Sequence, residues 1–228
     1  MKKMFNKRSV LNQSYRKYRI CNGENESEGG NINNCDMCGE DDDNPFNFSE
    51  SETVSNEGNR IYFYGEVEKP AVLSLNKAIH RISIALQNRA NELDTVPGNI
   101  FLHINSNGGD LFDGLIASDY VKKSKVPIHS IIDGVCASAA TFISVVSAKR
   151  FIHENSFMLI HELSSQAWGS YSKFKDEMYN LDILMNTIKK IYREHTKIPS
   201  KKLEEILKKD IYLSSEEALK FGLVDEII

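Results

Sequence analysis

The chain has 228 residues, of which 41% are hydrophobic, and its 28 lysines and arginines stand against 32 aspartates and glutamates. A net charge of −4 gives no reason to expect a nucleic acid or an anionic membrane surface as a partner. No apolar run is long enough to cross a bilayer and no secretory segment follows the basic start. These features favour a cytoplasmic protein, with an organelle or the cytoplasm of a host cell as alternatives. Four cysteines indicate a reducing compartment instead of a disulfide framework.

The first 57 residues differ in composition from the rest. Residues 1–20 are basic, no lysine or arginine follows until Arg60, and acidic residues gather in between. Such a sequence buries too little apolar surface to offset the entropy of ordering, so we expect a disordered extension over 1–57 and one folded domain over 58–228. Cys35 and Cys38 have the spacing of a zinc knuckle, but no nearby histidine completes a ligand set. Free thiols are therefore favoured, zinc is the alternative, and no metal site is predicted.

The folded part alternates strand and helix patterns, which is typical of an α/β domain. Short apolar or alternating runs predict strands at 59–67, 100–105, 127–132 and 157–161. Apolar residues at helical spacing predict helices at 71–93, 114–121, 139–146 and 172–194. The last of these helices carries an apolar stripe that serves either its own core or a contact with another subunit.

The segment 134–140 is the most informative of the chain. It holds Ser138 among alanines, between the strand expected at 127–132 and the helix expected at 139–146. The first amides of a helix lack intrahelical partners, so a serine at this junction would lie beside donors that can bind an oxyanion. A serine near a helix start is often only a cap, and this segment alone favours that simpler interpretation.

Two other side chains and a glycine pair change the balance. His161 ends an apolar run and Asp210 precedes one, so both lie at the margins of expected elements, as Ser138 does. Gly108 and Gly109 follow an expected strand, where residues without a Cβ let backbone amides approach a ligand. Serine, histidine and aspartate can form a nucleophilic triad, although the sequence does not show that they converge.

Together these segments resemble the ClpP family, the proteolytic subunits of ATP-dependent Clp proteases. The resemblance runs from about Arg60 to the C-terminus, with the glycines, serine, histidine and aspartate in the family's order. It rests on INSNGG at 104–109, GVCAS at 134–138, MLIH at 158–161, DIYLSSEEA at 210–218 and FGLVD at 221–225. The wording of 161–165 and 168–169 is similar to that of virus-encoded or phage-encoded members. Asn107 departs from the family's usual proline, and Ala139 from its frequent methionine.

The resemblance implies an α/β fold, with the layered ββα spiral core common to ClpP and crotonase proteins and a protruding handle helix at 172–194. It makes Ser138 the nucleophile, His161 the general base and then acid, and Asp210 the carboxylate that orients the imidazole. It assigns the oxyanion hole to the backbone N–H groups of Gly109 and Ala139. Extended substrate is expected to lie against Gly108, Asp110, Leu111, Leu163, Ser164 and Ser165.

The implied function is that of a serine endopeptidase subunit. The resemblance implies a homo-oligomer of stacked heptameric rings, with an AAA+ unfoldase that uses ATP to deliver unfolded proteins, and no cofactor in this chain. One alternative is a crotonase-like acyl-CoA enzyme, which shares the core and the glycine oxyanion hole but lacks a Ser–His–Asp set. Another is a non-catalytic regulatory ring subunit, which has no need to retain all three groups.

Overall fold

The computed structural model describes residues 53–228, so nearly all of the predicted N-terminal extension, including Cys35 and Cys38, lies outside the described residues. The boundary predicted after residue 57 is wrong by a few positions. Residues Val54–Glu57 form strand β1, which pairs antiparallel with the next strand. The hydrophobicity pattern did not indicate this strand, because only Val54 is buried and the strand is held by backbone pairing.

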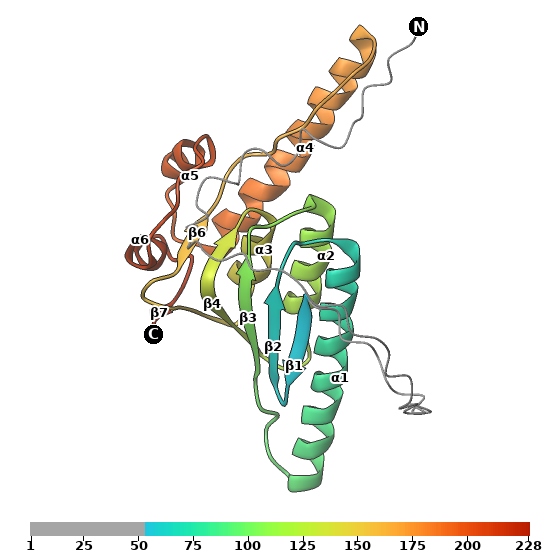
Figure 1. Ribbon diagram of the computed structural model, residues 1–228, viewed down its shortest axis with the longest axis vertical. Coiled ribbons are helices and arrows are strands. Elements are labelled where there is room, and N and C mark those ends of the chain that lie inside the picture. Colours follow the sequence, from blue (N-terminus) through green and yellow to red (C-terminus); the bar gives the residue numbers. More distant parts are fainter. Residues whose placement is uncertain (1–52) are drawn as a thin grey trace, which may run out of the picture. The chain divides into compact units, whose positions relative to one another are not determined.

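A mostly parallel sheet forms the centre of the described fold (Figure 1). Its path runs β1–β2–β3–β4–β5–β7, with β6 paired to β4 beside this path. All of the pairs except β1–β2 are parallel, which agrees with the burial of most residues of β3 and β4. The other strands are β2 (Arg60–Tyr64), β3 (Ile100–Ser106), β4 (Ile128–Ala137), β5 (Lys149–Ile152), β6 (Phe157–Leu159) and β7 (Glu226–Ile227).

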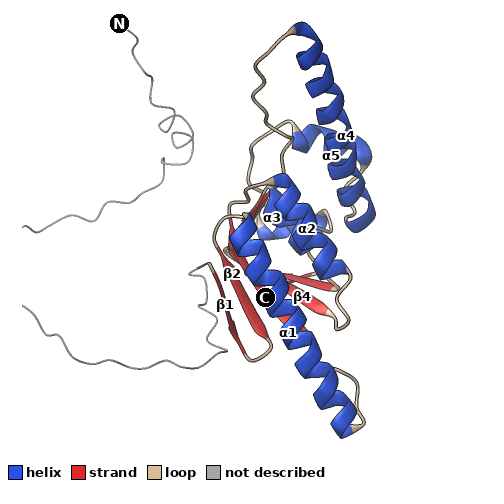
Figure 2. Cartoon of the chain, turned by 90° about the vertical axis from the view of Figure 1, so that its right-hand side faces the viewer, coloured by secondary structure: helices blue, strands red, loops and turns tan. Residues whose placement is uncertain are grey.

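The four predicted helices are present, together with two short ones that the sequence patterns did not indicate. The helices are α1 (Lys69–Leu93), α2 (Leu111–Lys122), α3 (Ala139–Val145), α4 (Tyr171–His195), α5 (Ser200–Leu207) and α6 (Ser215–Lys220). Helices α1 and α2 lie side by side along the sheet in both views (Figures 1 and 2). Over residues 53–228, no helix combines the length and the apolar character that crossing a membrane requires.

Helix α2 begins three residues before its predicted start because Asp110 caps it. The Asp110 carboxylate accepts hydrogen bonds from the N–H groups of Phe112 and Asp113, at 2.8 and 3.0 Å. Those amides have no partner inside the helix, and an aspartate at this position satisfies them and complements the helix dipole. The cap fixes the point where the chain leaves the glycine pair and enters the helix.

Helix α4 extends away from the sheet, as expected for a handle helix (Figure 1). Of its side chains, only Ile188 and Tyr192 are buried, and both lie near its C-terminal end. Phe174 and Met178, in its first half, are exposed by 45% and 60%. The apolar stripe therefore divides into a C-terminal part that packs on the core and an N-terminal part that is uncovered in the single chain.

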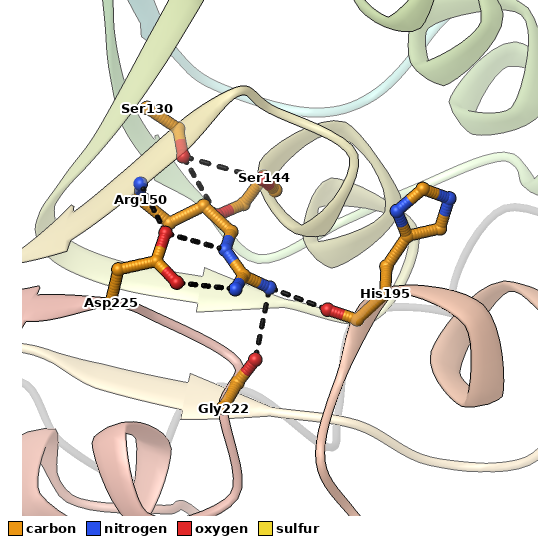
Figure 3. Close-up of polar contacts among 6 residues, drawn as sticks. All are labelled: Ser130, Ser144, Arg150, His195, Gly222 and Asp225. Atoms are coloured by element: carbon orange, nitrogen blue, oxygen red, sulfur yellow. Dashed lines mark hydrogen bonds and ion pairs between the residues drawn. The ribbon is translucent and has the colours of Figure 1, made fainter.

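Arg150 on β5 joins the end of α4 to the C-terminal segment (Figure 3). Its Nε and Nη2 donate to the two carboxylate oxygens of Asp225, and its Nη1 donates to the carbonyls of His195 and Gly222. Burial raises the pKa of Asp225, but the hydrogen bonds and charge of Arg150 outweigh it and hold this pKa below its usual value. One planar guanidinium thus fastens the base of α4 and the C-terminus to the sheet.

A buried pair of hydroxyl groups ties α3 to the sheet beneath it (Figure 3). Ser130 on β4 and Ser144 on α3 are both fully buried, and their Oγ atoms are 3.2 Å apart. The Ser130 hydroxyl also lies 3.3 Å from the carbonyl oxygen of Ser144. Because buried polar groups are costly without partners, this pair specifies how α3 sits on β4.

Candidate active site

Ser138 occupies a strained turn directly between β4 and α3. Its backbone has φ 53° and ψ −127°, and only one other non-glycine residue in the described part of the chain has a positive φ. Such a conformation costs on the order of 1–3 kcal/mol and persists only where the surroundings hold it. One such constraint is the hydrogen bond from the Ser138 N–H to the Leu159 carbonyl on β6, at 2.8 Å. A serine held on a sharp strand-to-helix turn is typical of an exposed nucleophile.

The structure brings His161 to Ser138. The distance between His161 Nε2 and Ser138 Oγ is 2.8 Å, within hydrogen-bonding range, although the residues are 23 positions apart. The cause is the parallel pairing of β4 with β6, in which Ala137 lies opposite Leu159. Each side chain follows closely after its strand, so both emerge at the same edge of the sheet. In this arrangement the imidazole can accept the proton of the serine hydroxyl.

Asp210 lies near His161 but is not hydrogen-bonded to it. The distance from His161 Nδ1 to Asp210 Oδ1 is 3.7 Å, and the aspartate side chain is 84% exposed. Two backbone contacts bring the segment here: the Glu162 N–H donates to Leu207, and Leu213 exchanges hydrogen bonds with Met158. The backbone therefore places Asp210 on the Nδ1 side of the imidazole, and its carboxylate is exposed to solvent.

Gly108 packs directly against the serine, and Gly109 packs against Val67. At Gly108, where φ is 96°, an added Cβ would lie 2.6 Å from the Cβ of Ser138 and 2.7 Å from the carbonyl oxygen of Ala137. At Gly109, with φ 154°, it would lie 2.3 Å from the carbonyl oxygen of Val67. No side chain fits at either position, which explains why two adjacent glycines occur here.

Backbone hydrogen bonds hold the glycine turn and leave one amide of the pair uncommitted. Val67 donates to the Gly108 carbonyl and accepts from the Asp110 N–H, both at 2.8 Å. The Gly108 N–H donates to the hydroxyl of Ser106 at 3.1 Å. None of these bonds uses the N–H of Gly109, so that group is available as a hydrogen-bond donor in the turn that packs on Ser138.

The residues predicted to contact substrate fall into two groups. Asp110 and Leu111 follow the glycine turn, but the Asp110 carboxylate is already engaged as the helix cap. Leu163, Ser164 and Ser165 lie in a segment without regular secondary structure between β6 and α4. The Leu163 N–H meets only the thioether sulfur of Met185, at 3.3 Å, which is a weak acceptor. The Ser165 hydroxyl donates to Glu177 at 2.7 Å.

Two side chains beside Ser138 were not predicted. The hydroxyl of Thr141 on α3 donates to the Ser138 carbonyl at 2.6 Å, and the same hydroxyl lies 2.6 Å from the hydroxyl of Tyr192 on α4. Thr141 gave a small signal in the sequence, since it is a polar residue inside an apolar run. Tyr192 gave none, because nothing in the sequence relates it to a residue 51 positions away.

Cys136 lies two residues before Ser138, but the structure gives it no reactive character. The thiol is fully buried, and burial raises its pKa far above the usual range. A protonated, inaccessible thiol is not a nucleophile, so the hydroxyl of Ser138 is the candidate at this turn. Across residues 53–228, histidine, cysteine, aspartate and glutamate form no cluster of three or more that could hold a metal ion.

Comparisons with known proteins agree with the motifs. The ATP-dependent Clp protease proteolytic subunit of Deinococcus radiodurans is 31% identical over 131 residues, which cover 57% of this chain and 64% of that protein. Proteolytic subunit 1 of the same protease from Prochlorococcus marinus is 30% identical over 138 residues, which cover 60% of this chain and 70% of that protein. The chain thus spans just under two thirds of the length of the first relative.

A solved structure supports the fold. A mutant of ClpP1 from Listeria monocytogenes superimposes with a TM-score of 0.65 at 22% identity, covering 75% of this chain and 91% of that one. This confirms the predicted ClpP-like α/β fold. Residues 71–228 match the family described as Clp protease, a region that holds the glycine turn, Ser138, His161 and Asp210. The chain belongs to the Clp protease family.

Proposed function

We propose that this chain is a serine endopeptidase subunit of a Clp-type protease that hydrolyses peptide bonds of unfolded proteins. The observation that carries the proposal is the 2.8 Å contact between Ser138 Oγ and His161 Nε2, at a strained turn that opens a helix. The relatives named above, which are described as proteolytic subunits, support the same reaction class.

In the proposed reaction, Ser138 Oγ attacks the substrate carbonyl carbon while its proton passes to Nε2 of His161. The carbonyl electrons move to the oxygen, and the N–H groups of Gly109 and Ala139 bind this oxyanion, each worth about 3–4 kcal/mol in the transition state. His161 then gives the proton to the leaving amine as the C–N bond breaks. Water cleaves the acyl-serine ester by the same route, with Asp210 favouring the imidazolium form.

The two alternative functions are less well supported. A crotonase-like acyl-CoA enzyme does not need a base at hydrogen-bonding distance from a serine, and residues 71–228 match the Clp protease family. A non-catalytic ring subunit would have no reason to keep Ser138 in a strained turn in contact with His161. Both observations favour a working hydrolase.

Labelling with a fluorophosphonate probe tests this proposal. We expect the full chain to be modified at Ser138, located by peptide mass mapping, and Ser138→Ala to remain unlabelled. Ser55→Ala, which changes an exposed serine on β1, is the matched control and should be labelled like the wild type. Labelling that persists in Ser138→Ala would eliminate the assignment, as would modification of another residue alone.

We also propose that the chain assembles into stacked heptameric rings and needs no cofactor of its own, because ATP is used by a partner AAA+ unfoldase. Two uncovered apolar surfaces support self-association. One is the exposed start of α4 with Phe174 and Met178, and the other is a groove of about 500 Å³ lined in part by the exposed Ile84, Ile116 and Tyr120. Exposed apolar side chains that gather on a folded domain are typical of an interface.

Mass photometry checks the assembly. The wild type should form a heptamer or two stacked heptamers, and Met178→Glu should leave single rings, because it places a charge in the exposed stripe of α4. Asn180→Glu is the control, since it adds the same charge about 200° around the helix from Met178. A monomer at every concentration would contradict the proposed rings, and equal effects of the two variants would contradict the role of the stripe.

A further inference from the structure

A chain of hydrogen-bonded groups runs from α4 to the carbonyl of Ser138. The Thr141 hydroxyl donates to that carbonyl at 2.6 Å, and the Thr141 N–H donates to it as well, at 3.0 Å. Because the one hydroxyl proton of Thr141 is used in this way, its oxygen accepts from the hydroxyl of Tyr192, 2.6 Å away. Hydrogen bonds are therefore donated in one direction, from Tyr192 to Thr141 and from Thr141 to the carbonyl of Ser138.

The hydrogen-bonded groups are buried. Thr141 is fully buried, and Tyr192 is 1% exposed with its ring 5.8 Å from that of Phe142. Burial also raises the pKa of Tyr192 well above its usual value, so the phenol keeps its proton and remains a donor. A buried hydroxyl that loses its partner is left unsatisfied at a cost, so each hydroxyl is expected to stay with the acceptor that the fold supplies.

The Ser138 carbonyl matters because it belongs to the same peptide group as the Ala139 N–H. In a planar trans peptide these two groups point in opposite directions, so whatever fixes the carbonyl oxygen also aims the amide. The torsion ψ of Ser138 rotates this whole group, and its value of −127° is part of an unfavourable combination with φ 53°. Relaxation of that strain would turn the Ala139 N–H away from its present direction.

We propose that Thr141 and Tyr192 are positioning residues that hold the Ser138–Ala139 peptide group in the orientation of an oxyanion donor. The inference rests on the proposed function of Ser138. Neither side chain touches the reacting atoms: Thr141 acts through the Ser138 carbonyl, and Tyr192 acts through Thr141. A tyrosine on the handle helix thereby supports the geometry of the catalytic turn.

Hydroxyl deletion tests the proposal through steady-state kinetics on a short fluorogenic peptide. Thr141→Val, which keeps the shape of the side chain, should lower kcat about 10- to 100-fold, less than the complete loss of an oxyanion donor. KM should stay within about twofold, since the interaction is made in the transition state. Thr141→Ser retains the hydroxyl and should restore most of kcat. Thr187→Val, on an outer turn of α4 where the hydroxyl bonds only to Ile183, should match the wild type.

Tyr192→Phe removes only the terminal hydroxyl and should lower kcat about threefold to tenfold. Its effect should disappear in the Thr141→Val background, because both residues act on one carbonyl. A peptide aldehyde, which forms a tetrahedral oxyanion with the serine, should bind more weakly to Thr141→Val by the factor lost from kcat. A cleavage product, which forms no oxyanion, should bind unchanged. A residue with a merely structural role would not separate these two ligands.

Three results would overturn the inference: an unchanged kcat in Thr141→Val, a loss in Thr141→Ser as large as in Thr141→Val, or weaker binding of the product peptide alone. If Thr141→Val does not fold, Tyr192→Phe still decides, because a wild-type kcat in that variant contradicts the proposed role of the hydrogen-bonded hydroxyl groups. Failure of the proposed function looks different, since the wild type itself would then neither cleave peptide nor be labelled at Ser138.

Discussion

His161→Ala is expected to lower kcat for peptide hydrolysis by about 10⁶ while the chain still folds and assembles. Among residues 53–228, the imidazole is the group within hydrogen-bonding distance of Ser138 Oγ, at 2.8 Å, and without it the hydroxyl has no base to accept its proton. Ser138→Ala should cost as much. The double variant should lose no more than either single variant, because the two residues act as one unit.

His153→Ala is the matched control for this experiment. This histidine follows β5, is half exposed, and pairs with Asp133 at 3.1 Å instead of with the serine. Its replacement should leave kcat within about twofold of the wild type. Steady-state kinetics on a fluorogenic peptide measures all four variants, with mass photometry to show equal assembly. Losses that add in the double variant would mean that His161 acts independently of Ser138.

The meeting of Ser138 and His161 could be anticipated only in part. The sequence indicates that Ser138 lies between an expected strand and a helix and that His161 ends a strand pattern, and parallel strands bring their carboxyl ends to one edge of a sheet. Which strands are neighbours depends on pairing between residues far apart in the chain, and the register of Ala137 with Leu159 decides the final distance. Local patterns do not contain that information.

Other features were missed for different physical reasons. Strand β1 is held by backbone pairing and one buried valine, so its polar sequence gave no apolar signal. The position of Asp210 depends on backbone contacts of its flanking residues and on the rotation of an exposed side chain, and neither is visible in a motif. The hydrogen bond between Thr141 and Tyr192 requires α3 and α4 to pack with one particular offset along their axes. Each of these is a tertiary property.

Gly108→Ala is expected to lower kcat/KM by about 10²- to 10³-fold, the range seen when an oxyanion donor is lost. The glycine pair was predicted to let backbone amides approach a ligand, and the structure shows Gly108 packed closely against protein atoms. The new methyl group would lie 2.6 Å from the Cβ of Ser138 and 2.7 Å from the carbonyl oxygen of Ala137. Neither atom belongs to a flexible side chain, so the glycine turn must move away and take the Gly109 amide with it.

Two control substitutions separate the possible causes of such a loss. Gly98→Ala adds the same methyl group where the nearest atom, in Leu86, is 3.8 Å away, and it should change neither stability nor activity. Gly58→Ala adds it at φ 57° with no atom within 4 Å, so it reports backbone strain alone. That variant should lower the free energy of unfolding by about 1 kcal/mol and leave kcat/KM unchanged.

Peptide kinetics and urea denaturation of the three glycine variants then distinguish contact from strain. If the close packing of Gly108 on Ser138 sets the oxyanion geometry, only Gly108→Ala loses activity, beyond what its reduced stability explains. A Gly108→Ala variant with wild-type kcat/KM would show that the turn can shift without moving the Gly109 donor. In that case the hole would depend on the Ala139 amide, and the orientation of the Ser138–Ala139 peptide group would matter more for catalysis than the glycine turn.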